Sequence, residues 1–336
     1  MKAIVQIGLW KAIAFLAAAV LFPFSFSGCC PDDDPDVPDT LFLPAVTVLP
    51  AINITLNSAT FIGLVVPFEP NTRVAFDYRL SSETVWQNKS VEGTFSGTDS
   101  VRFTLNVTGL KAGSEYVVRS RGYNKAGEVI SNIMTTFSTY ALSDYDGNLY
   151  HTIKIGNQVW LQENFKGTHF ANGDPIPNVT DQSAWNAMTT PAYCWYNNDP
   201  KIGEVYGGLY NFYVANDPRG LIAGFHTPSL DEWTTLANYL GGSEVAGGKM
   251  KEAGYAHWIQ PNAGATNSSG FTGLPSGVRQ EKFSNLGDGV VFWSTTKFMG
   301  MSNVAFATDL GQSSARLQLA AGSDLSCAHS IRLVQN

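Results

Sequence analysis

One histidine and one glutamate stand at a spacing that suits acid–base chemistry. Glu232 follows His226 by six residues in a segment with a helical start signal. An imidazole beside a carboxylate is a common arrangement in general-base and metal sites. No second ligand or nucleophile has a suitable spacing, and the other histidines are scattered over residues 151–329. We therefore expect His226 to pack or hydrogen-bond at the helix start, and we predict no catalytic residue, metal or cofactor.

Four cysteines offer thiol chemistry, and their positions suggest different roles. Cys29 and Cys30 are adjacent near the start of the chain, whereas Cys194 and Cys327 lie far apart in its second half. No Cys-x-x-Cys pair or Cys/His cluster has the spacing of zinc ligands. In an oxidising compartment Cys194 and Cys327 would form a disulfide, and the alternative is two buried free thiols.

Aromatic and amide side chains in the loop-rich second half suggest carbohydrate binding. Aromatic faces suit the apolar side of sugar rings, and Asn and Asp side chains suit hydroxyl groups. The main candidates are Trp195, Tyr196, Trp258, Asn262 and Asn267, with Trp293, Asn285 and Asp288 as further members. The alternative is that large rings build the core, which we expect of Trp160, Trp185, Trp233 and Trp293.

Residues 1–28 have the pattern of a lipoprotein signal peptide. Lys2 and Lys11 are basic, an apolar run follows, and small residues directly precede Cys29. The apolar run is too short for a membrane-spanning helix and is followed by a cleavage site. We expect Cys29 to become the lipidated first residue of the mature chain, which would anchor the protein to the outer membrane.

An acidic linker, residues 29–43, follows the signal. Its Asp and Pro residues cannot bury apolar surface, so we expect it to be solvated. The stretch from Pro31 to Asp36 resembles the acidic export signal of surface-exposed lipoproteins of the Bacteroidetes, which implies display at the cell surface. An inward-facing periplasmic anchor is the alternative. Two short triplets also resemble the O-glycosylation acceptor of such proteins, with Thr40 and Ser100 as the acceptor residues.

The composition narrows the class of protein. The 336 residues suggest about two domains, and the net charge of −7 argues against binding to nucleic acid or to anionic lipid. Charged residues make up 15% of the chain, aromatic residues 12%, and there are 32 glycines. This balance is typical of a β- and loop-rich extracellular protein.

Residues 44–139 are predicted to form a sandwich of short strands. Apolar residues alternate along Arg73–Leu80, and turn residues separate such runs. Tyr116 follows a turn, where a tyrosine can hydrogen-bond back across the sheet corner. The Gly109–Tyr116 pattern and the turn at residues 124–128 resemble a fibronectin type III module. The resemblance implies an all-β spacer or protein-binding arm, and we expect a spacer because the fold alone does not specify a function.

The elements that must position the candidate residues lie in the second half. The segment Asp144–Asn148 predicts a hairpin turn, because the closing Glu of a calcium loop is absent. Strands are predicted over residues 149–155, 158–161 and 290–293. Helices are predicted after Asp181 as far as Met188, after the Ser229/Glu232 capping box as far as Leu240, and over Glu244–Ala253.

Nine groups of residues in this half follow one another in the order of a single family. They are Asp146–Asn148, Ile155–Trp160, Glu163–Phe165, Pro191–Asp199, Tyr206–Tyr213, Gly224–Pro228, Ala246–Lys251, Gly264–Phe271 and Phe292–Thr295. On these residues the segment 143–336 resembles the Fibrobacter succinogenes major paralogous domain. The resemblance implies an α+β C-type-lectin-like fold, shared with formylglycine-generating enzymes, in a secreted or surface lipoprotein.

The resemblance also limits the chemistry. Ile222 and Leu333 stand where the family usually has two cysteines, so the family's disulfide does not transfer to this chain. The reactive cysteines of a formylglycine-generating enzyme are not evident. We expect a non-enzymatic surface lipoprotein that binds an outer-membrane protein or an extracellular ligand. The alternatives are a glycan-binding module and, less favoured, an enzyme.

Overall fold

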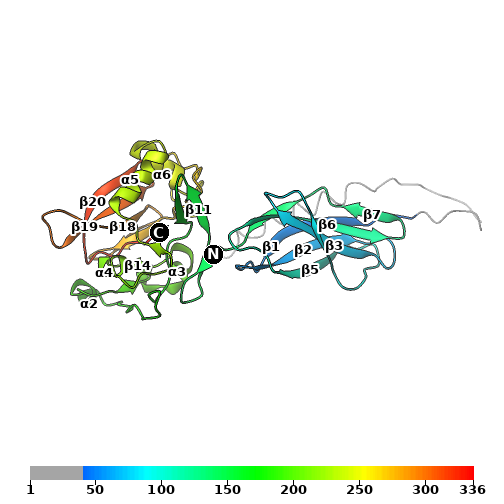
Figure 1. Ribbon diagram of the computed structural model, residues 1–336, viewed down its shortest axis with the longest axis horizontal. Coiled ribbons are helices and arrows are strands. Elements are labelled where there is room, and N and C mark those ends of the chain that lie inside the picture. Colours follow the sequence, from blue (N-terminus) through cyan, green and yellow to red (C-terminus); the bar gives the residue numbers. More distant parts are fainter. Residues whose placement is uncertain (1–40) are drawn as a thin grey trace, which may run out of the picture. The chain divides into compact units, whose positions relative to one another are not determined.

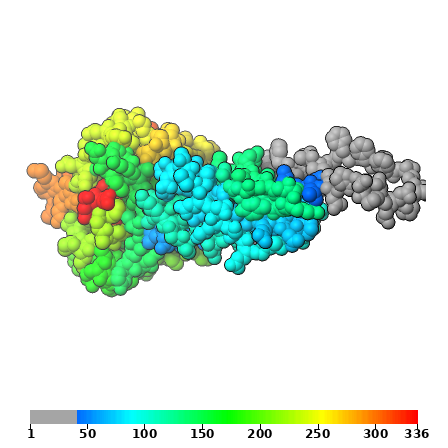
Figure 2. Space-filling model, turned by 45° about the vertical axis from the view of Figure 1, so that its right-hand side comes forward, coloured from blue at the N-terminus to red at the C-terminus, as the bar shows by residue number. Residues whose placement is uncertain are grey.

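The computed structural model describes residues 41–336 (Figure 1). The signal peptide, Cys29, Cys30, Thr40 and nearly all of the acidic linker lie outside these residues. None of the described helices has the length and apolar character needed to cross a membrane. Figure 2 shows the surface of the molecule, coloured from blue for the first described residues to red for the last.

The first domain is a sandwich of two antiparallel sheets. One sheet has the order β1-β2-β5, with β1 at Ala45–Ile52, β2 at Ser58–Val66 and β5 at Val101–Thr108. The other has the order β4-β3-β6-β7, with β8 also paired to β6. Its strands are β3 (Arg73–Leu80), β4 (Gln87–Ser90), β6 (Glu115–Asn124), β7 (Gly127–Ile130) and β8 (Thr135–Ser138). The period-two pattern therefore predicted the sandwich correctly.

Aromatic residues on the inner faces hold the two sheets together. The ring of Phe61 lies 5.6 Å from that of Phe76, 5.4 Å from that of Tyr78 and 5.6 Å from that of Phe137. Phe61 is 1% exposed, and burying such a side chain stabilises the fold by about 1.5–3 kcal/mol. At the sheet corner the backbone N–H of Lys111 donates to the Tyr116 hydroxyl at 2.8 Å, which confirms the predicted role of this tyrosine.

The second domain combines two larger sheets with two small ones. Its four-stranded sheet has the order β11-β12-β21-β15, and its five-stranded sheet has the order β17-β16-β18-β19-β20. The strands of the larger sheets are β11 (Thr152–Ile155), β12 (Gln158–Leu161), β15 (Phe225–His226), β16 (Ser276–Arg279), β17 (Phe283–Leu286), β18 (Gly289–Lys297), β19 (Val304–Gly311), β20 (Leu317–Asp324) and β21 (Val334–Gln335). The paired short strands are β9 (Leu142–Ser143) with β10 (Leu149–Tyr150), and β13 (Tyr193–Cys194) with β14 (Leu209–Tyr210).

Two of the helices follow from their caps. Asp181 caps α2 (Gln182–Asn186) by accepting from the backbone N–H of Ala184 at 2.7 Å. Ser229 and Glu232 form both bonds of a capping box at α5 (Leu230–Tyr239). These observations confirm the two predicted start signals.

The third predicted helix is shorter than expected, and two others were missed. Helix α6 covers Ser243–Met250 and ends there because Lys251 has an extended backbone. The sequence pattern did not predict α3 (Pro200–Tyr206) and α4 (Phe212–Ala215), since helices of one or two turns have little periodicity. Helix α5 packs on strands β18 and β20, and helix α6 packs on β20 (Figure 1).

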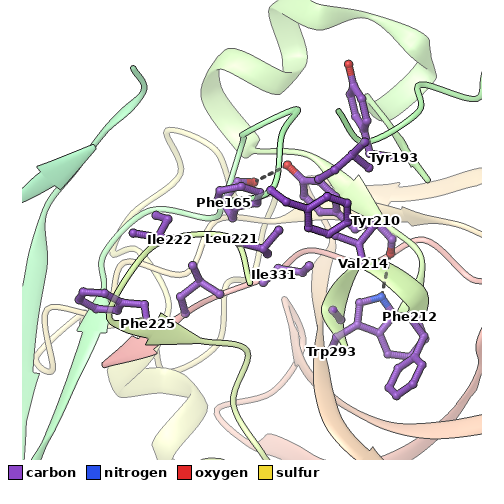
Figure 3. Close-up of a cluster of buried hydrophobic side chains, with 14 of the residues drawn as sticks. Phe165, Tyr193, Tyr210, Phe212, Val214, Leu221, Ile222, Phe225, Trp293 and Ile331 are labelled. Atoms are coloured by element: carbon purple, nitrogen blue, oxygen red, sulfur yellow. Dashed lines mark hydrogen bonds between the residues drawn. The ribbon is translucent and has the colours of Figure 1, made fainter. Parts of the chain in front are cut away.

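The predicted core tryptophans are all buried. Trp160, Trp185, Trp233 and Trp293 are at most 1% exposed. Figure 3 shows Trp293 pointing at the backbone of Tyr210, whose carbonyl accepts the indole N–H at 2.7 Å. The Tyr210 hydroxyl donates in turn to the carbonyl of Gly167 at 2.8 Å. The polar atom of each large ring is thus satisfied inside the core.

A buried arginine joins distant parts of this domain. The Nη1 atom of Arg332 donates to the carbonyls of Leu161 at 3.0 Å and Phe271 at 2.6 Å, and Nη2 donates to Oδ1 of Asn164 at 2.6 Å. Its guanidinium also lies 4.1 Å from the centre of the Phe271 ring. Complete burial lowers the pKa of Arg332 to about 9, so the group stays charged at neutral pH.

Candidate functional site

Two of the five predicted sugar-binding side chains lie in the interior. Trp258 is 2% exposed and donates its indole N–H to the carbonyl of Gly273 at 2.9 Å. Asn262 is 5% exposed, and its Nδ2 donates to the carbonyls of Glu252 and Gly254 at 2.9 and 2.8 Å. These bonds hold loops together, so both side chains are buried and not exposed on the surface as the sugar-binding prediction expected. Large rings and amides in glycine-rich loops serve packing here.

The other three candidates also support local structure. Tyr196 is 9% exposed and packs on Phe283, with ring centres 5.3 Å apart. Asn267 donates to the Thr272 hydroxyl and accepts from its backbone N–H, each at 2.9 Å. The half-buried ring of Trp195 covers Gly203 so closely that a Cβ atom there would lie 2.1 Å from it. The five side chains therefore do not form one binding surface.

Both cysteines of the expected disulfide are free thiols. Cys194 is buried and Cys327 is half-buried. Cys194 faces the guanidinium of Arg279, whereas Cys327 faces Ser323. Burial raises the pKa of the Cys194 thiol to about 11, which keeps it protonated at neutral pH. The structure thus matches the alternative of two free thiols rather than the Cys194–Cys327 bond.

The histidine and glutamate at the helix start bond to each other, as expected. Nε2 of His226 lies 2.7 Å from Oε1 of Glu232, and Nδ1 lies 2.7 Å from Oδ1 of Asn336. The other Glu232 oxygen accepts from the backbone N–H of Ser229 at 2.7 Å. Within residues 41–336, no three His, Cys, Asp or Glu side chains gather as a metal site. The pair therefore fixes the helix start and the chain end.

A serine and a histidine form a second pair that the sequence did not predict. Oγ of Ser323 lies 2.7 Å from Nε2 of His329. Nδ1 of His329 is buried with no partner in the described part of the chain, so no carboxylate orients this imidazole. Complete burial lowers the pKa of His329 to about 3, which makes it a weak base. The pair lacks the features of a nucleophilic site.

A polar groove lies where two hairpins of the five-stranded sheet separate. Strands β16 and β18 pair through Gly277 and Val290 alone, so the β16–β17 hairpin diverges from β18 and β19. The groove between them has a volume of about 400 Å³. Its lining includes the polar residues Asn285, Asp288, Asp309, Gln312 and Ser313 and the aliphatic residues Val278, Val290, Val291 and Leu310. We call it the acceptor groove.

Strand pairing and one tight turn place the polar residues of the acceptor groove. Asp288 ends the turn after β17, with its N–H donating to the carbonyl of Asn285 at 3.0 Å. Gly287 has φ +85°, which is the conformation required of the third residue of a type II turn. The Asp288 carbonyl accepts from the backbone N–H of Gln312 at 2.8 Å, which brings the two loops together.

A buried lysine braces the loop on one side of the acceptor groove. Nζ of Lys251 donates to the carbonyls of Gly311 at 3.0 Å and Ser314 at 2.8 Å, and to that of Ala263 at 2.9 Å. These bonds enclose Gln312 and Ser313 on both sides. Burial lowers the pKa of Lys251 to about 8, so the ammonium form prevails at neutral pH. Lys251 is thus a positioning residue for the groove.

The acceptors in the groove lack donors. Burial raises the pKa of Asp309, and the Arg316 guanidinium, which lowers it, offsets only part of this effect. Oε1 of Gln312 is buried without a hydrogen-bond partner among residues 41–336. An unpaired buried acceptor costs about 1–3 kcal/mol. The neighbouring Asp309 carboxylate is partly exposed and lines the groove, so a ligand can donate hydrogen bonds to it. The groove therefore suits a donor-rich ligand.

Sequence reasoning found only part of the acceptor groove. Asn285 and Asp288 were among the further candidates, whereas Asp309, Gln312 and Ser313 were missed. One signal was available, since an Asp inside the apolar β19 sequence is unfavourable in a strand unless it has a role. The pairing of Gly289 with Gly311, which brings the two sides together, has no local signature.

Comparison with known proteins decides the family of the second domain. A model of the Fibrobacter succinogenes major domain matches residues 153–335, which is more than half of the chain. The chain belongs to this family. The acceptor groove, Lys251 and Arg332 all lie within the Fibrobacter succinogenes major domain, and the residues that carried the resemblance in the sequence do as well.

Several solved structures are similar to part of the chain. The sensor domain of the anti-sigma factor RsgI4 of Pseudobacteroides cellulosolvens is 23% identical and has a TM-score of 0.24, with 31% of this chain and 100% of that chain covered. The third fibronectin III domain of human KIAA0343 protein is 18% identical and has a TM-score of 0.19, with 34% and 93% covered.

Proposed function

We propose that the protein is a non-catalytic binding protein of the cell surface, and that its acceptor groove binds a hydroxyl-rich extracellular ligand, a glycan. The observation that carries the proposal is the partly exposed, partly desolvated Asp309 carboxylate in the groove lining, which has no hydrogen-bond donor among residues 41–336. Elsewhere in this domain the buried groups Arg279 and Lys251 have their nitrogen atoms bonded to oxygen acceptors. The groove differs from these sites because its charged groups are carboxylates that have no donor partner among residues 41–336.

The lining favours a sugar over an apolar ligand. Carboxylate and amide oxygens accept hydrogen bonds from sugar hydroxyls, and Asn285 and Ser313 can both donate and accept. Val278 and Val291 supply aliphatic surface against which the C–H groups of a ring can pack. The predicted aromatic platforms take no part, because those rings are used for packing.

A protein partner is the second candidate, and the two carboxylates favour it. Asp288 and Asp309 would attract a lysine or arginine side chain of an outer-membrane protein. The two classes differ in their response to salt. Affinity for a cationic partner falls steeply as ionic strength rises, whereas affinity for a neutral glycan changes little.

The proposal includes a lipid anchor and a fold relationship. Cys29 would carry lipid that holds the protein in the outer membrane, with display at the cell surface. The second domain would be a member of the C-type-lectin-like α+β class. Metabolic labelling with a fatty-acid analogue tests the anchor, since Cys29→Ser should abolish labelling and Cys30→Ser should not. Equal labelling of the Cys29→Ser variant would contradict it.

The binding test pairs groove variants with a matched control. The mature protein is screened on a glycan array, and the best ligand is titrated by calorimetry. We expect Asp288→Asn with Asp309→Asn to weaken binding at least about tenfold, because charge-assisted hydrogen bonds are lost. Glu281→Gln removes one exposed charge from the neighbouring β16–β17 turn, outside the groove, and should leave affinity unchanged.

Three outcomes would overturn the proposal. Equal binding by the double variant would place the ligand elsewhere. A cationic peptide that binds through the same residues would replace the glycan with a protein partner. Cleaved or modified glycan in the titration cell would make the protein an enzyme.

A further inference from the structure

The first domain carries a second groove on the outer face of its β4-β3-β6-β7 sheet. The groove has a volume of about 600 Å³ and is lined by Arg73, Ser90, Val91, Gly93, Thr94 and Tyr123. We call it the arginine groove. Its volume lies within the range of small-molecule sites. A domain that serves only as a spacer has no need of such a groove.

Strand register explains the hollow. Arg73 on β3 lies opposite Tyr123 on β6. The next residue of β3, Val74, is 0% exposed and faces the core, so Arg73 and Tyr123 lie on the outer face of the sheet. The next outward position of β3 is Ala75, which lies opposite Ser90 on β4. Ala75 itself is covered, whereas the small Ser90 lines the groove together with Arg73 and Tyr123.

The other arginines of this face are already occupied. Arg119 and Arg121 donate to the Asp77 carboxylate at 3.0 and 2.7 Å, and Arg121 also pairs with Glu128. Arg79 donates to the carbonyl of Leu80 at 3.1 Å. The planar groups of Arg79 and Arg119 also lie 4.8 and 4.1 Å from the ring centre of Trp86.

Arg73 differs from these arginines. It is exposed, and no carboxylate of residues 41–336 forms an ion pair with it. Glu92 lies between the lining residues Val91 and Gly93 in the sequence but does not itself line the groove. Ser90, Thr94 and Tyr123 line the same groove as Arg73, and the hydroxyl group of each can bond to a further hydroxyl. The arginine groove therefore combines a guanidinium without an ion-pair partner and hydroxyl groups that can bond to a ligand.

We propose that the arginine groove binds a carboxylated sugar, with its carboxylate on the Arg73 guanidinium and its ring against Tyr123. A guanidinium presents two parallel donors that match a carboxylate. The three hydroxyls match the hydroxyls of a sugar, and the tyrosine face suits its C–H groups. A peptide fits less well, because the groove offers no deep apolar pocket for a side chain. The first domain is then a binding domain, independent of the acceptor groove.

Calorimetry with a galacturonic acid trimer tests this on the whole mature protein. We expect binding that weakens as salt rises and that is absent for a galactose trimer. Arg73→Gln should weaken it about tenfold or more, Arg73→Lys should weaken it less, and Ser90→Tyr should block it by filling the hollow. Arg102→Gln, which removes an exposed arginine from β5 of the other sheet, should have no effect.

The outcomes separate this site from the acceptor groove. Asp288→Asn with Asp309→Asn should leave binding of the galacturonic acid trimer unchanged. Equal affinity of the Arg73→Gln variant would overturn the proposal, as would equal binding of the neutral trimer. Tighter binding of an acidic peptide with the same dependence on Arg73 would replace the sugar with a protein ligand. Thermal unfolding of Arg73→Gln should match the wild type, since this side chain has no bonds to lose.

Discussion

Buried charged groups have several hydrogen-bond partners in the interior of the second domain, but the carboxylate of the acceptor groove does not. In the interior, Arg332 and Lys251 each donate to three or more oxygen atoms from separate loops. In the groove, Asp309 is desolvated, and the positive charge of Arg316 only partly compensates for this. The first two groups hold the fold, whereas the carboxylate is desolvated at some expense in stability, and we propose that it serves a ligand.

The largest expected effect comes from the interior. Arg332→Met leaves the carbonyls of Leu161 and Phe271 and the Asn164 amide oxygen without their donor. We expect the free energy of unfolding to fall by about 3–5 kcal/mol, measured by urea denaturation. Arg316→Met is the control, since this arginine is half exposed, and it should change stability by about 0.5 kcal/mol or less. A small effect of Arg332→Met would show that the buried charge is dispensable.

The next largest effect concerns Lys251, which connects the interior of the domain with the acceptor groove. Lys251→Met leaves three carbonyls unpaired and should lower the free energy of unfolding by about 1–3 kcal/mol. Because these bonds enclose Gln312 and Ser313, ligand affinity at the acceptor groove should fall as well. Lys282→Met, on the exposed β16–β17 turn, should change neither. Unchanged affinity in a destabilised Lys251→Met protein would remove the lysine from the account of the groove.

A smaller effect concerns pH. Burial lowers the pKa of His151, but the hydrogen bond and charge of Glu163 outweigh burial, so the folded-state pKa lies above the ordinary 6.5. The stability that this pair contributes is therefore fully present below about pH 6.5 and is lost as pH rises through the folded-state value. We expect His151→Gln to destabilise the protein more at pH 6 than at pH 8. Glu163→Gln should remove the same pH dependence, and a constant difference across this range would contradict the assignment.

Local rules predicted much of the fold. Alternating residues such as those of Arg73–Leu80 identified the sandwich, and the caps at Asp181 and Ser229 located two helix starts. These features depend on residues close in sequence, so they can be recognised without the structure. The helix expected to reach Ala253 ends at Met250, because Lys251 has an extended backbone and forms a bridge with the distant Gly273.

The sites were harder to predict, because pairing between distant strands builds them. The acceptor groove exists because β16 leaves β18 after one bridge, at Gly277 and Val290. The arginine groove depends on the register that places Arg73 opposite Tyr123, both of which line it. Composition pointed instead to Trp258 and Asn262, which are buried in the structure. Residue type alone does not reveal whether a polar group already has its partners.

Two measurements on Asp309→Asn, stability and glycan affinity, test whether this carboxylate serves ligand binding. In the folded state burial raises the pKa of Asp309, so the folded protein binds this proton more tightly than the unfolded chain does, and ionisation at neutral pH costs stability. We expect the free energy of unfolding of the variant to be higher by about 0.5 kcal/mol at pH 7. We also expect the variant to bind the glycan less tightly. A loss of stability together with unchanged affinity would contradict it, because Asp309 would then be structural.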